Sequence, residues 1–266
     1  MEKLRKALDR ARDERNGVRP AAPEAPPPPP DAAPYSYTST RVFTPDAATL
    51  ERNRVLALGA TSEVADAFRM LRTQVAQRMG EHEWRTLSVV SPSRGDGRTL
   101  AATNLAIMLA SDPRYSVLLC DLDLRAPGVA STFGLDVKAG VDDVLAGRAN
   151  VESCLVHPAG YDRLVLLPAR APLARSSEYL ASSATHQLVA ELKNRYPDRI
   201  LIFDLPPVLV TDDALAFTPC SDCALMVVSE GTTRREDVVR SMEILHNTPI
   251  VGTLLNRSLA RKSAAA

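Results

Sequence analysis

Residues 86–100, TLSVVSPSRGDGRTL, decide the fold of this chain. The apolar run TLSVV is typical of a buried strand, and the run that opens at Thr99 has the composition of a helix. Between them, Gly95 and Gly97 let backbone amides turn toward an anion, and a helix N-terminus adds a positive dipole. A strand, a glycine-bearing bend and a helix in this order predict a phosphate-binding loop.

This loop departs from the usual pattern GxxxxGK[ST] at two positions. Pro92 stands where the first glycine is expected, and Arg98 stands where the lysine is expected. Arginine keeps the charge, but its guanidinium is wide and planar and misplaces that charge in a tight loop. Losing one well-placed donor in a reacting site typically costs about 3 kcal/mol. We therefore expect nucleotide binding to survive this change more readily than catalysis.

Short apolar runs alternate with longer helical stretches along the rest of the chain. The runs are continuous rather than alternating, as in strands covered on both faces, and the helices between them provide right-handed crossovers. The sequence predicts an α/β fold, a mostly parallel sheet flanked by helices. The expected strands are 86–90, 116–121, 163–168, 200–204, 224–228 and 250–256, and the expected helices lie near 62–79, 99–110, 141–146, 178–195 and 234–246.

One main domain with a separate N-terminal segment is expected. Residues 1–16 have a narrow apolar stripe at helical spacing, which predicts an amphipathic helix that docks on a partner helix, a membrane surface or its own domain, or stays solvated. Residues 17–60 contain a proline-rich run and are expected to be a flexible linker. Residues 61–257 form the predicted nucleotide-binding domain, and residues 258–266 are expected to be a disordered tail.

Charge and apolar content argue against several classes of protein. Lysine plus arginine and aspartate plus glutamate number 32 each, so no global field favours nucleic acid. No apolar stretch approaches the roughly 20 residues that cross a bilayer, and no signal peptide is visible. Cys220 and Cys223 form one CxxC motif, but no second pair or nearby histidine completes a zinc site. We expect a cytoplasmic protein with no nucleic-acid partner.

Acidic residues follow two further predicted strands. Asp121 and Asp123 close the run VLLCDLD, and Asp204 closes ILIFD. Sites in parallel sheets lie beyond the carboxyl ends of the strands, so these carboxylates are expected beside the loop. Magnesium prefers a few carboxylates and several waters, and the Thr99 hydroxyl can hold it. The sequence therefore predicts a magnesium-dependent nucleotide site.

Together these motifs resemble the bacterial tyrosine kinases that regulate capsule and exopolysaccharide export, which are relatives of the MinD/ParA-type positioning ATPases. The resemblance covers about residues 60–257 and rests on SPSRGDGRT, LLCDLDLRAP and IFDLPPVLVTDDAL. It implies a P-loop NTPase of the deviant Walker A type, with ATP and Mg²⁺ as cofactors.

The resemblance also implies roles for individual residues. Asp121 and Asp204 would coordinate or orient the magnesium shell with Thr99 as a direct ligand, and Asp123 would serve near the attacking hydroxyl. Asn256 would contact the adenine edge, and Arg257 would stack on the ring. The implied catalytic set is Arg98, Asp121, Asp123 and Asp204, and the implied nucleotide contacts in the loop are Ser93, Arg94, Gly95, Asp96, Gly97, Arg98, Thr99 and Leu100.

Partners follow from the same resemblance. In the family, a Glu-x-x-Arg-x-x-Arg helix packs subunits into a ring, and here Asp66, Arg69 and Arg72 have that spacing, which implies a homo-oligomer. A separate membrane-spanning chain-length determinant protein is the implied partner, which would recruit the chain to the inner face of the plasma membrane. No tyrosine follows Tyr196, so self-phosphorylation of a C-terminal tyrosine cluster is not expected.

Three functions are compatible with these motifs. The first is an ATP-dependent tyrosine kinase that acts on a partner or on the linker. The second is a nucleotide-binding regulatory subunit of the polysaccharide assembly system that has lost catalysis. The third is a positioning ATPase, which is disfavoured because Ser93 stands where those relatives carry an extra lysine.

Overall fold

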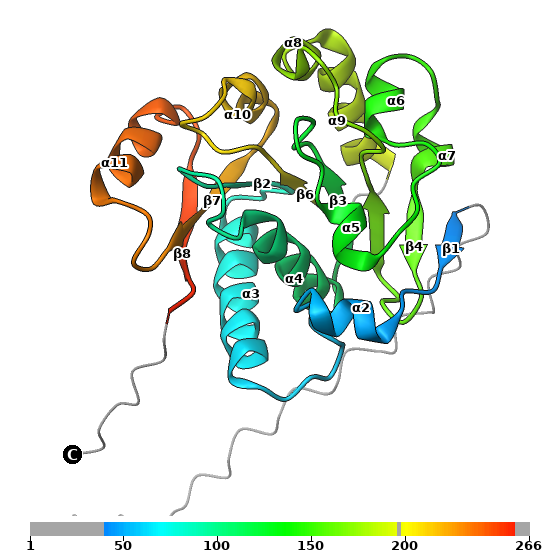
Figure 1. The fold of residues 1–266 in the computed structure, drawn as a ribbon, viewed down its shortest axis with the longest axis horizontal. Coiled ribbons are helices and arrows are strands. Elements are labelled where there is room, and N and C mark those ends of the chain that lie inside the picture. The colour runs from blue at the N-terminus through cyan, green and yellow to red at the C-terminus, as the bar shows by residue number, and fades with distance from the viewer. Residues whose placement is uncertain (1–39, 196–197, 259–266) are drawn as a thin grey trace, which may run out of the picture. The chain divides into compact units, whose positions relative to one another are not determined.

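The computed structural model describes residues 40–195 and 198–258 and confirms the predicted architecture, a mostly parallel sheet with helices on both faces (Figure 1). Neighbouring strands are parallel except β4 and β5, which pair antiparallel. In spatial order the strands are β1 (Arg41–Phe43), β4 (Val156–Pro158), β5 (Leu164–Leu167), β3 (Ser116–Asp121), β6 (Arg199–Asp204), β2 (Thr86–Val90), β7 (Cys223–Ser229) and β8 (Ile250–Asn256).

The helices connect these strands and cover the sheet. Those before β4 in the chain are α2 (Ala47–Arg52), α3 (Glu63–Glu81), α4 (Arg98–Ala110), α5 (Val129–Phe133), α6 (Val141–Leu145) and α7 (Val151–Cys154). Those after it are α8 (Ser176–Leu180), α9 (Ser183–Arg195), α10 (Asp213–Phe217), a short 3-10 helix (Thr218–Cys220) and α11 (Arg235–Ile244).

Alternate residues of each central strand enter two separate hydrophobic clusters. In β3, Val117 and Leu119 pack in the cluster beneath α3, α4 and α5, whereas Leu118 and Cys120 pack in the cluster beneath α6 to α10. A strand sends successive side chains to opposite faces, so a strand covered on both faces must be apolar throughout. This explains why the continuous apolar runs of the sequence were a reliable signal.

The six predicted strands are all present, with ends that differ by at most one residue. The three-residue strands β1 and β4 were not predicted, nor were the short helices α2, α5, α7 and α10. The helix predicted over 178–195 is instead two helices, α8 and α9. The break falls at Ser182, whose hydroxyl donates to the Tyr179 carbonyl at 2.6 Å and accepts from the Thr185 amide at 3.4 Å.

Residues 40–60, nearly half of the predicted linker, contain β1 and α2, so the prediction of a flexible linker is wrong there. Residues 41–43 pair with β4, and Asp46 caps α2 by accepting from the Thr49 amide at 2.9 Å. The Leu56 side chain is buried, and its amide donates to Asn104 Oδ1 at 2.9 Å. The predicted N-terminal helix, the proline-rich part of the linker and residues 259–266 of the tail lie outside the described residues.

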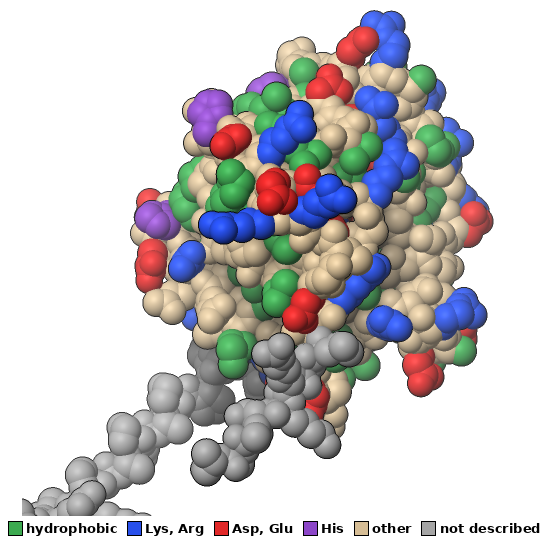
Figure 2. All heavy atoms as spheres, turned by 60° about the vertical axis from the view of Figure 1, so that its left-hand side comes forward, with side chains coloured by type: hydrophobic (Ala, Val, Ile, Leu, Met, Phe, Trp, Pro, Cys, Tyr) green, Lys and Arg blue, Asp and Glu red, His purple; other side chains and the backbone are tan. Residues whose placement is uncertain are grey.

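Across residues 40–195 and 198–258, no helix combines the length and apolar character needed to cross a bilayer. On the face drawn in Figure 2, lysine and arginine side chains are scattered among acidic and hydrophobic ones. This distribution matches the equal totals of basic and acidic residues in the sequence.

The two-sided burial of the central strands predicts a large difference between two leucines. Leu119 in β3 is fully buried, whereas Leu255 in the edge strand β8 is 51% exposed. Leu119→Ala should lower the free energy of unfolding by about 3 kcal/mol, because it leaves a cavity in the core. Leu255→Ala, the matched control, should lower it by less than about 1 kcal/mol. Urea unfolding measures both, and equal losses would contradict this description of the sheet.

Candidate functional site

Three neighbouring strands bring the predicted site residues to one edge of the sheet. β6 lies between β3 and β2, and Asp121, the last residue of β3, stands opposite Asp204, the last residue of β6. The loop 91–97 follows β2, which pairs with the other side of β6. The carboxyl ends of parallel strands meet at a common edge, so the loop and both aspartates lie together as the sequence predicted.

Gly97 sets the geometry of the loop where it meets α4. Its φ of 87° is left-handed, and it occupies the N-cap position of the helix. A Cβ at this position would lie 2.0 Å from Asn256 Nδ2. That amide nitrogen donates to the Asp96 carbonyl oxygen at 2.8 Å. Asn256, expected at the adenine edge, therefore holds the loop in this structure.

Asp96 ties the loop to a distant turn. Its side chain is buried, and it accepts from the Ser93 amide at 3.0 Å and from Thr233 Oγ1 at 2.8 Å. Thr233 lies between β7 and α11 and was missed by the sequence reasoning, because nothing in its local pattern marks it. The Asp96 carboxylate thus fixes the shape of the loop.

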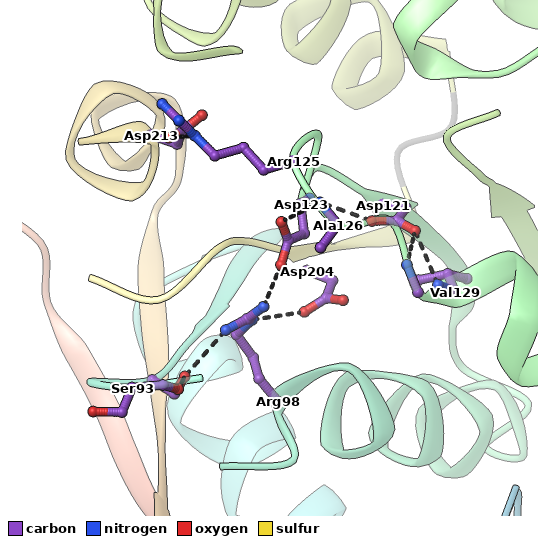
Figure 3. Close-up of polar contacts among 11 residues, drawn as sticks. Ser93, Arg98, Asp121, Asp123, Arg125, Ala126, Val129, Asp204 and Asp213 are labelled. Carbon is purple, nitrogen blue, oxygen red and sulfur yellow. Dashed lines mark hydrogen bonds and ion pairs between the residues drawn. The ribbon is translucent and has the colours of Figure 1, made fainter. Parts of the chain in front are cut away.

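The Arg98 guanidinium lies between two carboxylates (Figure 3). Its Nη2 donates to Asp123 Oδ2 at 2.6 Å, and its Nε donates to Asp204 Oδ1 at 3.1 Å. Its Nη1 donates to Ser91 Oγ at 3.1 Å. All three nitrogens are used, and the residue is only 8% exposed. We call this arrangement of Arg98, Asp123, Asp204 and Ser91 the arginine latch.

Asp121 anchors the start of α5. Its Oδ2 accepts from the amides of Gly128 and Val129, each at 2.9 Å, and its Oδ1 accepts from the Asp123 amide at 3.3 Å. Burial, with a further contribution from the charge of Asp204, raises the pKa of Asp121 well above its ordinary value of 3.8. The carboxylate that was predicted to orient a metal shell therefore accepts hydrogen bonds from backbone amides of the chain.

Asp204 is fully buried and only partly satisfied. Burial raises its pKa, and the positive charge of Arg98 opposes that shift. Its Oδ1 accepts from Arg98, while its Oδ2 has no hydrogen-bond partner. An unpartnered buried oxygen of this kind marks a place where a proton or a ligand can bind.

The carboxylates as arranged do not fit a directly bound magnesium ion. Asp121, Asp123 and Asp204 offer six oxygens, and five of them accept hydrogen bonds from the protein, leaving only Asp204 Oδ2. Within the described ranges, no three His, Cys, Asp or Glu side chains form a group that could hold a metal. Mg²⁺ usually keeps several waters and binds one or two carboxylates, and in this arrangement a direct bond to any oxygen but Asp204 Oδ2 would compete with a hydrogen bond from the chain.

Two cavities flank the arginine latch. The first, of about 480 Å³, is lined by Asn53, Gly95, Asp96, Gly97, Arg98, Thr99, Leu100, Gly128, Ser131, Thr132 and Arg257. The second, of about 220 Å³, is lined by Arg94, Gly95, Arg98, Thr99, Asp123, Arg125, Ala126, Pro206, Pro207 and Thr211. Gly95, Arg98 and Thr99 line both cavities, so they stand between them. The first cavity has the size of a small-molecule site.

A second ion pair near the site was not predicted. Arg125 Nε donates to Asp213 Oδ2 at 2.8 Å, which joins the segment after β3 to the start of α10 (Figure 3). Both residues lie in motifs that the sequence had singled out, but spacing alone gives no sign that they meet.

The predicted oligomerisation triplet makes contacts within its own chain. Arg69 pairs with Asp66 at 3.1 Å and also donates to the Ala60 carbonyl at 2.9 Å and 3.0 Å. Arg72 donates to Ser111 Oγ at 3.2 Å. Packing between subunits stays a prediction.

Comparison with known proteins relates the chain to one domain family and to several tyrosine-protein kinases. The model of the AAA domain family matches residues 84–237. Tyrosine-protein kinase YwqD of Bacillus subtilis is 27% identical over 209 residues, which cover 78% of this chain and 86% of that protein. Tyrosine-protein kinase wzc of Salmonella typhimurium is 28% identical over 79% of this chain but 29% of its own length. The succinoglycan biosynthesis transport protein ExoP of Rhizobium meliloti is 28% identical over 77% of this chain and 26% of its own length.

Solved structures of a tyrosine kinase domain and of a septum site-determining protein resemble this chain in fold. The kinase domain of the Escherichia coli tyrosine kinase ETK superposes with a TM-score of 0.68 at 27% identity, covering 76% of this chain and 78% of that one. The septum site-determining protein MinD of Pyrococcus horikoshii, solved with Mg-ADP, has a TM-score of 0.55 at 24% identity and covers 65% of this chain and 72% of its own. The second likeness concerns the fold alone.

The contact between Gly97 and Asn256 predicts unequal effects of two alanine substitutions. Gly95 and Gly97 both have positive φ, but a Cβ at Gly95 meets nothing within 4 Å. Gly95→Ala should cost about 1 kcal/mol of backbone strain. Gly97→Ala should cost about 2 kcal/mol, because Asn256 must also abandon its hydrogen bond to Asp96.

Chemical denaturation measures this difference, and the Asn256→Ala background is its control. In that background the two glycine variants should cost the same. Equal costs in the wild-type background would show that Asn256 does not hold the loop.

Proposed function

We propose that this chain is a nucleotide-binding regulator of exopolysaccharide or capsule assembly in which phosphotransfer is impaired. The chain belongs to the AAA domain family and is a homologue of bacterial tyrosine kinase domains. The observation that carries this proposal is the arginine latch, in which the Arg98 guanidinium is hydrogen-bonded to Asp123 and Asp204.

Binding of ATP or ADP is supported by the first cavity. The loop residues Gly95 to Leu100 form one wall of it, and the N-terminus of α4 opens onto it. Backbone amides at a helix N-terminus attract phosphate, and Arg257, which also lines the cavity, adds a positive charge. These groups can hold a polyphosphate without help from Arg98.

Impaired phosphotransfer is supported by the state of Asp123. In transfer to a tyrosine, the hydroxyl oxygen forms a bond to the γ-phosphorus, the bond to the β-phosphate oxygen breaks, ADP leaves, and a carboxylate receives the hydroxyl proton. Asp123 Oδ2 accepts from Arg98, and its Oδ1 accepts from the Ala126 amide at 3.1 Å. Both oxygens of Asp123 therefore already accept hydrogen bonds from the protein, and the loop lacks the ammonium that would contact the phosphates.

A role in polysaccharide assembly is supported by the relatives, among them one named for succinoglycan biosynthesis and transport. We extend to this chain the expectation of a membrane-spanning partner that brings it to the inner face of the plasma membrane, and of self-association through the α3 face that carries Asp66, Arg69 and Arg72. In this proposal, the bound nucleotide sets the state of the assembly and the chain transfers no phosphate.

Replacing Arg98 by lysine tests the proposal. The wild-type chain should bind ATP, as measured by calorimetry, with no phosphate release above background. Arg98→Lys should release phosphate at about a hundred times the background rate, because a compact ammonium can leave Asp123 and reach the phosphates.

Arg148→Lys is the matched control, because Arg148 also pairs with an aspartate, Asp143, but lines neither cavity. It should behave as the wild type does. Turnover by the wild-type chain would overturn the impaired function in favour of an active kinase, and absence of nucleotide binding would overturn the proposal altogether.

A further inference from the structure

We infer that the guanidinium of Arg98 holds the place of the divalent cation in this site, so that the first cavity takes a nucleoside diphosphate or triphosphate without magnesium. The inference rests on the proposed nucleotide binding and concerns a different property, the metal requirement. Its starting point is the misfit between the carboxylates and a metal ion described above.

The Arg98 guanidinium occupies the space between the two carboxylates. Arg98 lies between Asp123 and Asp204 and contacts one oxygen of each, at 2.6 Å and 3.1 Å. A magnesium ion shared by these carboxylates, directly or through its waters, would need the oxygens that the guanidinium now occupies. Magnesium and the guanidinium therefore compete for the same carboxylate oxygens, and the guanidinium is a covalent part of the chain.

The shape of the guanidinium suits it to this position better than a lysine ammonium would. A planar guanidinium presents donors in a fixed fork, so it can contact two carboxylates and a hydroxyl at once, whereas an ammonium is a single point of charge. Ser91 supplies that third contact at 3.1 Å. The latch is buried, and removing a partner from a buried charge pair is strongly unfavourable. A hydrated magnesium ion is thus a poor competitor.

The residues that line the first cavity include sources of positive charge other than a metal ion. Magnesium normally offsets part of the phosphate charge, so a site without it needs another source of positive potential. Here the first residues of α4, the glycines of the loop and Arg257 line the same cavity, and a helix N-terminus contributes positive potential. The nucleotide can therefore bind beside the latch and leave it closed.

Calorimetric titration of the full chain with ADP and with ATP, each in excess magnesium and in excess EDTA, tests this inference. The wild-type Kd should agree within about threefold between the two conditions. Arg98→Lys should bind at least about tenfold more weakly in EDTA than in magnesium, because a lysine leaves carboxylate oxygens open to the ion. Arg148→Lys, the control for a lost arginine–aspartate fork elsewhere, should match the wild type.

The wild-type titrations decide the question even where Arg98→Lys fails to fold, which a thermal melt of that variant would reveal. Wild-type binding that is at least about tenfold tighter in magnesium would overturn the inference while leaving the proposed nucleotide binding intact. No binding in either condition would overturn both.

Discussion

The buried pairing of Arg98 with Asp123 and Asp204 is the interaction on which this site depends. A guanidinium taken out of water must be matched by carboxylates with good geometry, and here three nitrogens find three acceptors. The same contacts occupy one oxygen each of Asp123 and Asp204 and the hydroxyl of Ser91. Arg98 thus joins residues at the carboxyl ends of three neighbouring strands, β2, β6 and β3.

The sheet makes this pairing possible. Because β6 lies between β3 and β2, the loop, Asp121 and Asp204 meet at one edge without any long connection. Hydrogen bonds from Asn256 and Thr233 then fix the loop from the far side, through the carbonyl and the carboxylate of Asp96. The loop is thus held by hydrogen bonds from β8 and from the turn between β7 and α11.

Much of this arrangement could be predicted from the sequence, because buried parallel strands leave continuous apolar runs and their acidic ends mark the site. The six long strands and the convergence of Asp121 and Asp204 were predicted on that basis. Short elements such as β1 and β4 carry too few residues for a periodic signal, so they were missed. The direction of the Arg98 side chain was also out of reach, because it depends on carboxylates that other strands bring beside it, Asp123 and Asp204.

A crystal structure of the chain grown with ADP and magnesium is the most direct test of the arginine latch. We expect the two phosphates of ADP to lie against the loop in the first cavity. The Arg98 guanidinium should still be within hydrogen-bond distance of Asp123 and Asp204, with no metal between them. A structure in which Arg98 has turned onto the phosphates, with a magnesium ion held near Thr99 and Asp204, would contradict it.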